Sequence, residues 1–210
     1  RPRRCEILYE AGDTAEEAEE EALPDYPVTV FFTREGYFKK ITPQSLRMSG
    51  EQKLKEGDEI VFQQETKNDV WLLFFTNKCQ VYKCRACDFA DGKASVLGDY
   101  VAAVLGMEPE ETPVYMALTA DYRGHMLFFY QNGKCAKVPM ESYATKQNRK
   151  KLLKAYSDKA PLAQMVQLPQ EEELAIETSA GRMLLVGSAQ ISEKQTRDTA
   201  GVAVITLKKN

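Results

Sequence analysis

Short apolar runs separated by polar turns make up most of the chain after residue 27. The clearest runs combine β-branched and aromatic residues: VTVFFT (28–33), VWLLFFT (70–76), VY (81–82) and MLFFY (126–130). Side chains of this kind fit the pleated, half-buried surface of a sheet, so these runs predict β-strands. Helical periodicity is weak except over 140–156, where Lys and Arg fill the polar positions. The chain is therefore predicted to be all-β.

An internal repeat organises these strands. Four segments align without gaps: FFTREGYFKKI (31–41), FFTNKCQVYKC (74–84), FFYQNGKCAKV (128–138) and IETSAGRMLLV (176–186). Each has an apolar start, a polar turn and a second strand, which together predict a β-hairpin. The copies recur at intervals of roughly 40–50 residues, a period typical of propeller-like blades. We therefore predict a disc of about four antiparallel, four-stranded blades, with Phe32, Phe75, Phe129 and Val138 buried.

The turn position of the repeat holds Gly36, Gly133 and Gly181, which suit a backbone with positive φ. The second copy has Cys79 there, so we expect its hairpin to turn through Asn77 or with another geometry. Positions two and five after the turn are apolar in all four copies. Strict alternation does not place both on one face, so the pattern predicts a β-bulge between them.

Lysine occupies the fourth position after the turn in three copies, as Lys40, Lys83 and Lys137, whereas the fourth copy has Leu185. Equivalent positions of a radial array lie around a rim, where a ring of lysines would hold a bent polyanion such as duplex DNA. Segment 134–159 is also strongly basic, although it could be a solvated face. The expected DNA-binding residues are Lys39, Lys40, Lys83, Arg85, Lys134, Lys137, Lys146, Arg149, Lys150, Lys151, Lys154 and Arg182.

The net charge of −3 hides an acidic N-terminal stretch. Residues 1–26 lack a clear core pattern, so we expect an acidic linker there and a single domain over 27–210. No apolar run approaches the roughly 20 residues that a membrane span requires, and no signal peptide is evident. The missing initiator Met suggests an excised fragment. Five cysteines are too few for a disulfide scaffold and point to a reducing cytoplasm.

Few residues offer catalytic or metal chemistry. Cys79, Cys84 and Cys87 have the spacing of some iron–sulfur ligands, but two of them lie inside the repeat, where packing is the favoured interpretation. His125 is the only histidine, and no glycine-rich phosphate loop is present. We expect no catalytic residue, metal or cofactor. A redox protein remains the third hypothesis, after a DNA-binding module and a propeller-type protein-interaction platform without DNA binding.

Four stretches carry a resemblance to a known family: RRCEI (3–7), VTVFFTREGYFKKI (28–41), DVWLLFFTNKCQVYK (69–83) and TAGVAVITLKK (199–209). They are similar to the C-terminal domain of the A subunit of bacterial type IIA topoisomerases, DNA gyrase or topoisomerase IV. The resemblance implies a β-pinwheel, whose blades exchange strands, and a role in bending or wrapping duplex DNA. It also implies two protein partners: a separate ATPase subunit, and the catalytic core that precedes this domain in the same polypeptide.

The chain departs from the family in two places. Gyrase A subunits resemble one another in an Arg/Gly-rich box of the pattern QRRGGRG, whereas this chain has RMSGEQKLKEG at 47–57. The resemblance therefore leaves a gyrase-like and a topoisomerase IV-like role open. Only four repeats are visible, fewer than a six-bladed disc would need. No tyrosine sits in a motif matching the family's DNA-cleaving residue, so the fragment alone is expected to be non-catalytic.

Overall fold

The computed structural model of the chain describes residues 25–145 and 150–205. Most of the expected acidic linker, together with Lys146 and Arg149, lies outside the described residues, so the domain boundary stays a prediction. Within the described ranges, no helix is long and apolar enough to cross a membrane.

The four predicted hairpins are present. They are β1 (Pro27–Thr33) with β2 (Tyr37–Ile41), β4 (Trp71–Thr76) with β5 (Val81–Arg85), β8 (His125–Tyr130) with β9 (Lys134–Pro139), and β12 (Glu173–Glu177) with β13 (Met183–Gly187). All four pair antiparallel. The helices are short: α1 (Pro43–Met48) and α2 (Val101–Val104). Where the structure describes residues 140–156, their basic periodicity corresponds to a 3-10 turn at Met140–Tyr143 and to the short strand Lys151–Leu152, and the described part contains no α-helix.

The remaining strands extend these hairpins into four-stranded sheets. They are β3 (Ile60–Lys67), β6 (Asp99–Tyr100), β7 (Pro113–Thr119), β10 (Lys151–Leu152), β11 (Leu162–Leu168) and β14 (Val202–Ala203). The first blade has the order β3-β1-β2-β6, the second β10-β5-β4-β7 and the third β11-β8-β9-β14, while β12-β13 forms a fourth sheet of two described strands. The predicted antiparallel β-pinwheel is confirmed, with three complete blades.

Strand exchange links each blade to the next. After the second hairpin the chain crosses back to the first blade as β6 and only then supplies β7 to its own blade. After the third hairpin it lends β10 to the second blade, and after the fourth it lends β14 to the third. Each sheet is therefore completed by a segment that follows the next hairpin. We call the described parts of these three returning segments the crossovers (86–98, 140–145 with residue 150, and 188–201).

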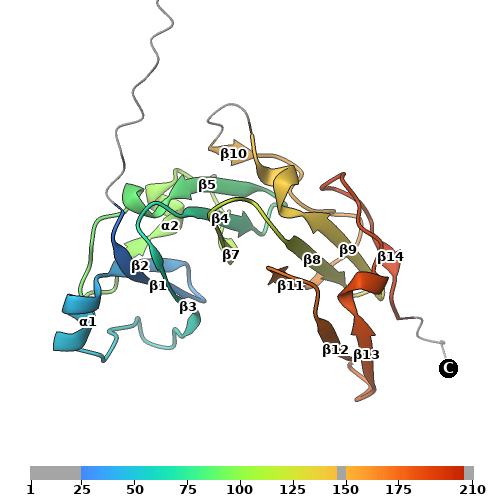
Figure 1. The fold of residues 1–210 in the computed structure, drawn as a ribbon, viewed down its shortest axis with the longest axis horizontal. Helices are drawn as coiled ribbons and strands as arrows, with labels where there is room; N and C mark the ends of the chain where they lie inside the picture. The colour runs from blue at the N-terminus through green and yellow to red at the C-terminus, as the bar shows by residue number, and fades with distance from the viewer. Residues whose placement is uncertain (1–24, 146–149, 206–210) are drawn as a thin grey trace, which may run out of the picture.

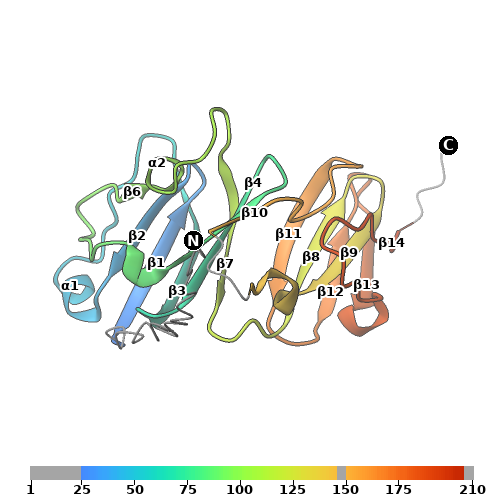
Figure 2. The ribbon, with the colours of Figure 1, turned by 90° about the horizontal axis from the view of Figure 1, so that it is seen from above.

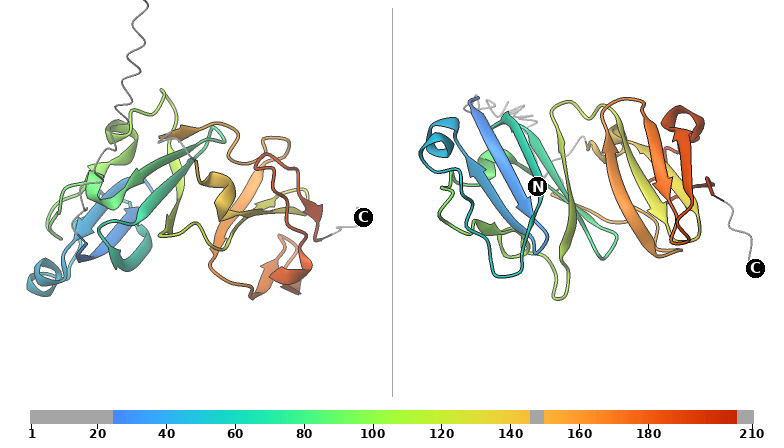
Figure 3. Two further views of the ribbon diagram at one scale, coloured as in Figure 1. Left: turned by 45° about the horizontal axis from the view of Figure 1, so that its top comes forward. Right: turned by 90° about the horizontal axis from the view of Figure 1, so that it is seen from below.

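The blades stand side by side along an arc (Figure 1). The borrowed strands β10 and β14 lie on its convex side, whereas β7 and β11 lie on its concave side. Views from above and below show the same row of sheets, from β1–β3 at one end to β12–β13 at the other (Figures 2 and 3). In the second and third blades the borrowed strand thus forms the convex edge.

The second hairpin corrects one expectation from the sequence. Cys79 itself adopts the left-handed conformation, with φ of 55°, beside 76° for Gly133 and 88° for Gly36. Its backbone N–H donates to the carbonyl of Thr76, as the Gly36 N–H does to that of Thr33. The hairpin therefore keeps the geometry of its glycine counterparts, even though a side chain at positive φ is strained.

The predicted bulge in the second strand of each hairpin is wrong. The ladders of β2, β5 and β9 with their hairpin partners are continuous. Positions two and five after the turn are both buried because these strands are covered on both faces. Thus Val81 packs toward the third blade and Cys84 toward the first. Register shifts occur instead at Phe32/Thr33, Phe75/Thr76 and Leu162/Gln164.

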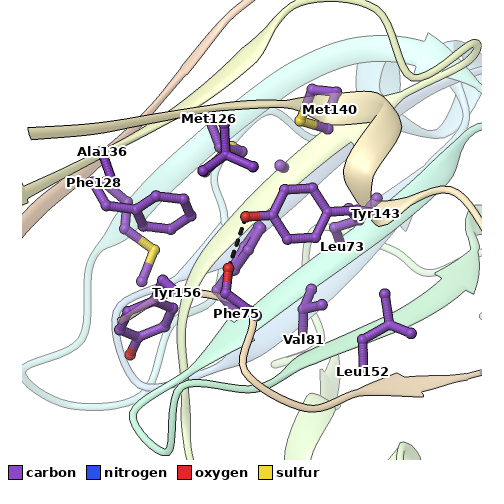
Figure 4. Packing of buried hydrophobic residues seen from close by; sticks show 14 of the residues in the cluster. Leu73, Phe75, Val81, Met126, Phe128, Ala136, Met140, Tyr143, Leu152 and Tyr156 are labelled. Carbon is purple, nitrogen blue, oxygen red and sulfur yellow. Dashed lines mark hydrogen bonds between the residues drawn. The ribbon is translucent and has the colours of Figure 1, made fainter. Parts of the chain in front are cut away.

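The largest cluster of buried side chains lies between the second and third blades (Figure 4). Phe75 makes edge-to-face contacts with Phe128 and Tyr143, at ring distances of 5.7 and 5.3 Å. The Tyr143 hydroxyl donates to the Ala155 carbonyl at 2.8 Å, which satisfies the polar end of a fully buried ring. Phe32, Phe75 and Val138 are buried as predicted, whereas Phe129 is half-buried.

Candidate nucleic-acid interface

The aligned lysines do not form an exposed rim. Lys40, Lys83 and Lys137 are only 2%, 5% and 4% exposed, and the predicted Lys39 is 3% exposed. We call Lys40, Lys83 and Lys137 the repeat lysines. Each crossover runs over the strand that carries one of them and covers its side chain. The placement expected from the sequence is therefore wrong, because exposure was inferred from the hairpin alone.

In the first and third blades the buried ammonium meets a carboxylate. Lys40 Nζ lies 2.5 Å from Asn68 Oδ1 and 3.2 Å from Asp91 Oδ1. Lys137 Nζ lies 2.5 Å from Glu171 Oε1 and also donates to the Ser188 carbonyl at 3.1 Å. These contacts compensate for the cost of burying a charge. These contacts also attach the crossovers to the blades, because Asp91 and Ser188 are crossover residues.

The ammonium of Lys83 has no such carboxylate among the described residues. It donates to Thr145 Oγ1 at 3.1 Å and lies 5.4 Å from the ring centre of Trp71 and 5.1 Å from that of Tyr122. Burial lowers the pKa of Lys83, and the nearby charge of Arg197 lowers it further. Arg85 stacks on the same indole at 4.3 Å, so two cations share Trp71.

Lys39 points away from this side of the sheet and is held entirely by backbone. Its Nζ donates to the carbonyls of Lys53 and Val96, both at 3.0 Å. Burial lowers the pKa of Lys39. The side chain therefore anchors the 49–59 loop to the first crossover.

Each crossover carries one exposed lysine among the described residues, close to exposed carboxylates such as Asp91 and Glu193. Lys93, Lys150 and Lys194 are exposed, one on each crossover, and none forms an ion pair with another described residue. Backbone hydrogen bonds attach each crossover close to its exposed lysine, but not at one equivalent position, since Gly92 and not Lys93 matches Lys194. The Gly92 N–H donates to the Lys40 carbonyl, the Lys194 N–H donates to the Lys137 carbonyl, and the Lys150 carbonyl accepts from the Lys83 N–H. We call Lys93, Lys150 and Lys194 the crossover lysines.

Only Lys150 of these three was predicted from the sequence. The other two were missed because the gapless alignment ends with each hairpin, and the distance from the hairpin to the crossover lysine differs between copies. A basic residue shortly after every hairpin was the available signal. It becomes informative only when the strand exchange is known.

The other predicted basic residues are scattered. Lys154 is exposed beyond β10, Lys134 is half-buried at the start of β9, and Arg182 is exposed in the fourth hairpin turn. Lys151 is half-buried and pairs with Glu108 at 2.6 Å, and this hydrogen bond raises the pKa of Lys151. The structure therefore brings Lys83, Arg85 and Lys150 together at the second blade, while Arg182 stands apart on the fourth.

The described residues provide no cluster of three or more His, Cys, Asp or Glu side chains that could hold a metal. Cys84 is buried, and burial raises the pKa of its thiol. His125 begins β8, and its Nε2 lies 2.7 Å from Glu193 Oε2 on the third crossover. These side chains serve packing and crossover attachment in this structure.

The pairing of Glu171 with Lys137 predicts a pH-dependent contribution to stability. The hydrogen bond from Lys137 lowers the pKa of Glu171. The stability that the ionised Glu171 contributes is therefore fully present above the pKa of the unfolded chain, about 4.3. It is lost as the pH falls through the lower pKa of the folded protein. Glu171→Gln should reduce the free energy of unfolding at pH 7 by about 1 kcal/mol, since the carboxylate is partly screened.

Urea unfolding of Glu171→Gln and wild type at several pH values measures this effect. The difference between the two proteins should shrink at acidic pH, where the wild-type carboxyl is protonated. Glu172→Gln is the matched control, because Glu172 is exposed and forms no ion pair with another described residue. An undiminished difference at low pH would show that the ion pair is not its source.

Comparison with known proteins gives a consistent set of relatives. No protein-family model matches this sequence. The chain is 27% identical over 150 residues to the DNA gyrase A subunit of Streptomyces coelicolor, covering 67% of this chain and 17% of that protein. It is 25% identical over 191 residues to the DNA topoisomerase 4 A subunit of Staphylococcus aureus, covering 89% and 24%. The chain thus spans about a quarter or less of these relatives.

Solved structures agree in fold. The C-terminal domain of DNA topoisomerase IV superposes with a TM-score of 0.74 at 24% identity, covering 89% of this chain and 59% of that one. The E. coli ParC C-terminal domain gives a TM-score of 0.63 at 18% identity, covering 86% and 72%. The resemblance seen in the sequence is confirmed, and so is the fold that it implied.

Proposed function

We propose that this chain, which is homologous to the A subunits of DNA gyrase and topoisomerase IV, is a non-catalytic module that holds and bends duplex DNA. The observation that carries the proposal is the set of exposed crossover lysines, one for each complete blade. A duplex passing the three crossovers would meet, at each complete blade, a positive charge that has no ion pair among the described residues. Such contacts to phosphates need no base reading and suit binding without sequence preference.

The convex shape supports bending as well as binding. Bending a 20–30 bp duplex requires a free energy on the order of 1–6 kcal/mol, so several contacts along the duplex must together compensate for it. The crossover lysines are distributed over three blades, and Lys154 adds a further exposed charge beside Lys150. The buried repeat lysines then have a separate role, because they attach the crossovers that present these charges.

The parent protein is proposed to be the A subunit of a cytoplasmic type IIA topoisomerase, whose partners are its own catalytic core and an ATP-hydrolysing subunit. The segment in the position of the gyrase box forms α1 and an exposed loop, and Lys53 N–H of that loop donates to the Ala94 carbonyl. It lacks the Arg/Gly-rich pattern. DNA bending of the topoisomerase IV type is therefore favoured over box-dependent wrapping.

Binding to labelled duplexes of unrelated sequence across a salt series tests the proposal. Log affinity should fall linearly with log salt, with a slope of about −0.9 per contacted phosphate, and should be similar for all sequences. If the two ends of a duplex are labelled for energy transfer, the distance between the labels should decrease on binding, because the duplex bends. No salt-dependent affinity for any duplex would reject DNA binding and would favour a protein-interaction platform.

A further inference from the structure

The second blade differs from its neighbours in what neutralises the repeat lysine. Lys40 has the carboxylate of Asp91, and Lys137 has that of Glu171. At the same position of the repeat, Lys83 meets only the hydroxyl of Thr145 and two aromatic rings. A buried ammonium is costly without an anion, so this blade lacks a charge that its neighbours possess.

Three more basic residues lie beside Lys83, one on its own strand and two on the crossovers. Arg85 shares the ring of Trp71 with it, and the Lys150 carbonyl accepts a hydrogen bond from the Lys83 backbone. Arg197 approaches from the third crossover, where it donates to the Ser142 carbonyl at 2.9 Å. Its charge contributes to the lowered pKa of Lys83, and no carboxylate of the described residues is seen to raise it.

Nearby acidic groups are engaged elsewhere. Asp88 accepts from the backbone N–H of Arg85, and Asp121 pairs with Arg123. No described carboxylate forms an ion pair with Lys83, Arg85, Lys150 or Arg197. The intervening residues 146–149 read KQNR, so the sequence supplies no acid there either. Around the junction of the second and third blades, four basic residues therefore have no carboxylate partner among the described residues.

We propose that Lys83, Arg85, Lys150 and Arg197 form an oxyanion site that binds a phosphate group in the role that Asp91 and Glu171 fill in the neighbouring blades. The half-buried guanidinium groups of Arg85 and Arg197 offer charge-assisted hydrogen bonds, which are stronger than neutral ones. Lys83 stands behind them as a fixed charge. The inference rests on the proposed function for its source of phosphate, the DNA backbone.

The structure supplies its own reporter for this site. Trp71 is the only tryptophan in the chain, and it lies against both Arg85 and Lys83. Titration with inorganic phosphate at constant ionic strength should change Trp71 emission and raise the thermal midpoint, because a ligand that binds only the folded state stabilises it. Chloride at the same ionic strength should do neither.

Thr145→Glu tests the assignment by supplying the missing carboxylate. This substitution should weaken phosphate binding by about tenfold or more. It should also make the slope of log DNA affinity against log salt shallower by about 0.9, the value for one phosphate contact. Thr145→Gln is the control for side-chain size. Ser179→Glu, in the exposed fourth hairpin turn, is the control for net charge. Both controls should bind phosphate like the wild type.

If Thr145→Glu does not fold, Arg197→Gln takes its place, with the same loss expected. Absence of any phosphate effect on emission and thermal midpoint in the wild type would overturn the site, as would equal binding by all variants. DNA binding without a phosphate effect would reject the oxyanion site alone. A phosphate effect without DNA binding would keep the site and reject the proposed function.

Discussion

Reversing the three crossover lysines together, as Lys93→Glu, Lys150→Glu and Lys194→Glu, should lower the affinity for duplex DNA by roughly a hundredfold at low salt. Each lysine lies on the crossover of a different blade, so the triple variant removes one charge from every complete blade. The salt slope should become shallower by about 2.7, which corresponds to three phosphate contacts at about 0.9 each. Fluorescence anisotropy with duplexes of two unrelated sequences measures both quantities.

The control for this experiment has the same change in net charge. Lys67, Lys78 and Lys159 are exposed but lie outside the crossovers, and their reversal to Glu should alter affinity much less. Circular dichroism confirms that both triple variants keep the fold. Equal losses in the two would mean that DNA responds to total charge and that the crossovers do not define a path.

The hairpins and their assembly into blades were accessible from the sequence because their signals are local. Apolar pairs, a turn and a second strand fall within one short segment, and the segment recurs. Even Cys79, which lacks the freedom of glycine, follows the same turn, since the strands on either side impose it. Local residue patterns and the repeat period therefore predicted the fold class correctly.

Burial of the repeat lysines was not accessible in the same way. The segment that covers Lys40 is the crossover around Asp91, which follows the next hairpin in the sequence. The sequence pattern of one repeat cannot reveal that its lysine is covered by a segment that follows the next repeat. Leu185 illustrates the point, because it occupies the same repeat position in the fourth hairpin and is 67% exposed. The described residues contain no crossover that runs over it.

The binding site was only partly predictable for a related reason. Hairpins are aligned by their strands, but crossovers vary in length and attachment, so the lysines that they carry do not align in the sequence. The basic segment 134–159 identified Lys150 by density of charge alone. The same criterion also selected Lys137, which is buried against Glu171. A high density of basic residues identifies a segment of the chain, but the tertiary structure decides which of its lysines are exposed.

Phe75→Ala should lower the free energy of unfolding by about 3–5 kcal/mol, a larger loss of stability than we expect from truncating any half-buried side chain of this domain. Phe75 is fully buried at the centre of the cluster that joins the second and third blades, where it contacts Phe128 and Tyr143. Truncation removes both ring contacts and leaves a cavity that rigid strands cannot close. Urea unfolding should show a lower midpoint with an unchanged m-value. Phe129→Ala is the control, because Phe129 is only half-buried and should lose well under half as much. A loss below about 1 kcal/mol for Phe75→Ala would contradict tight packing between these blades.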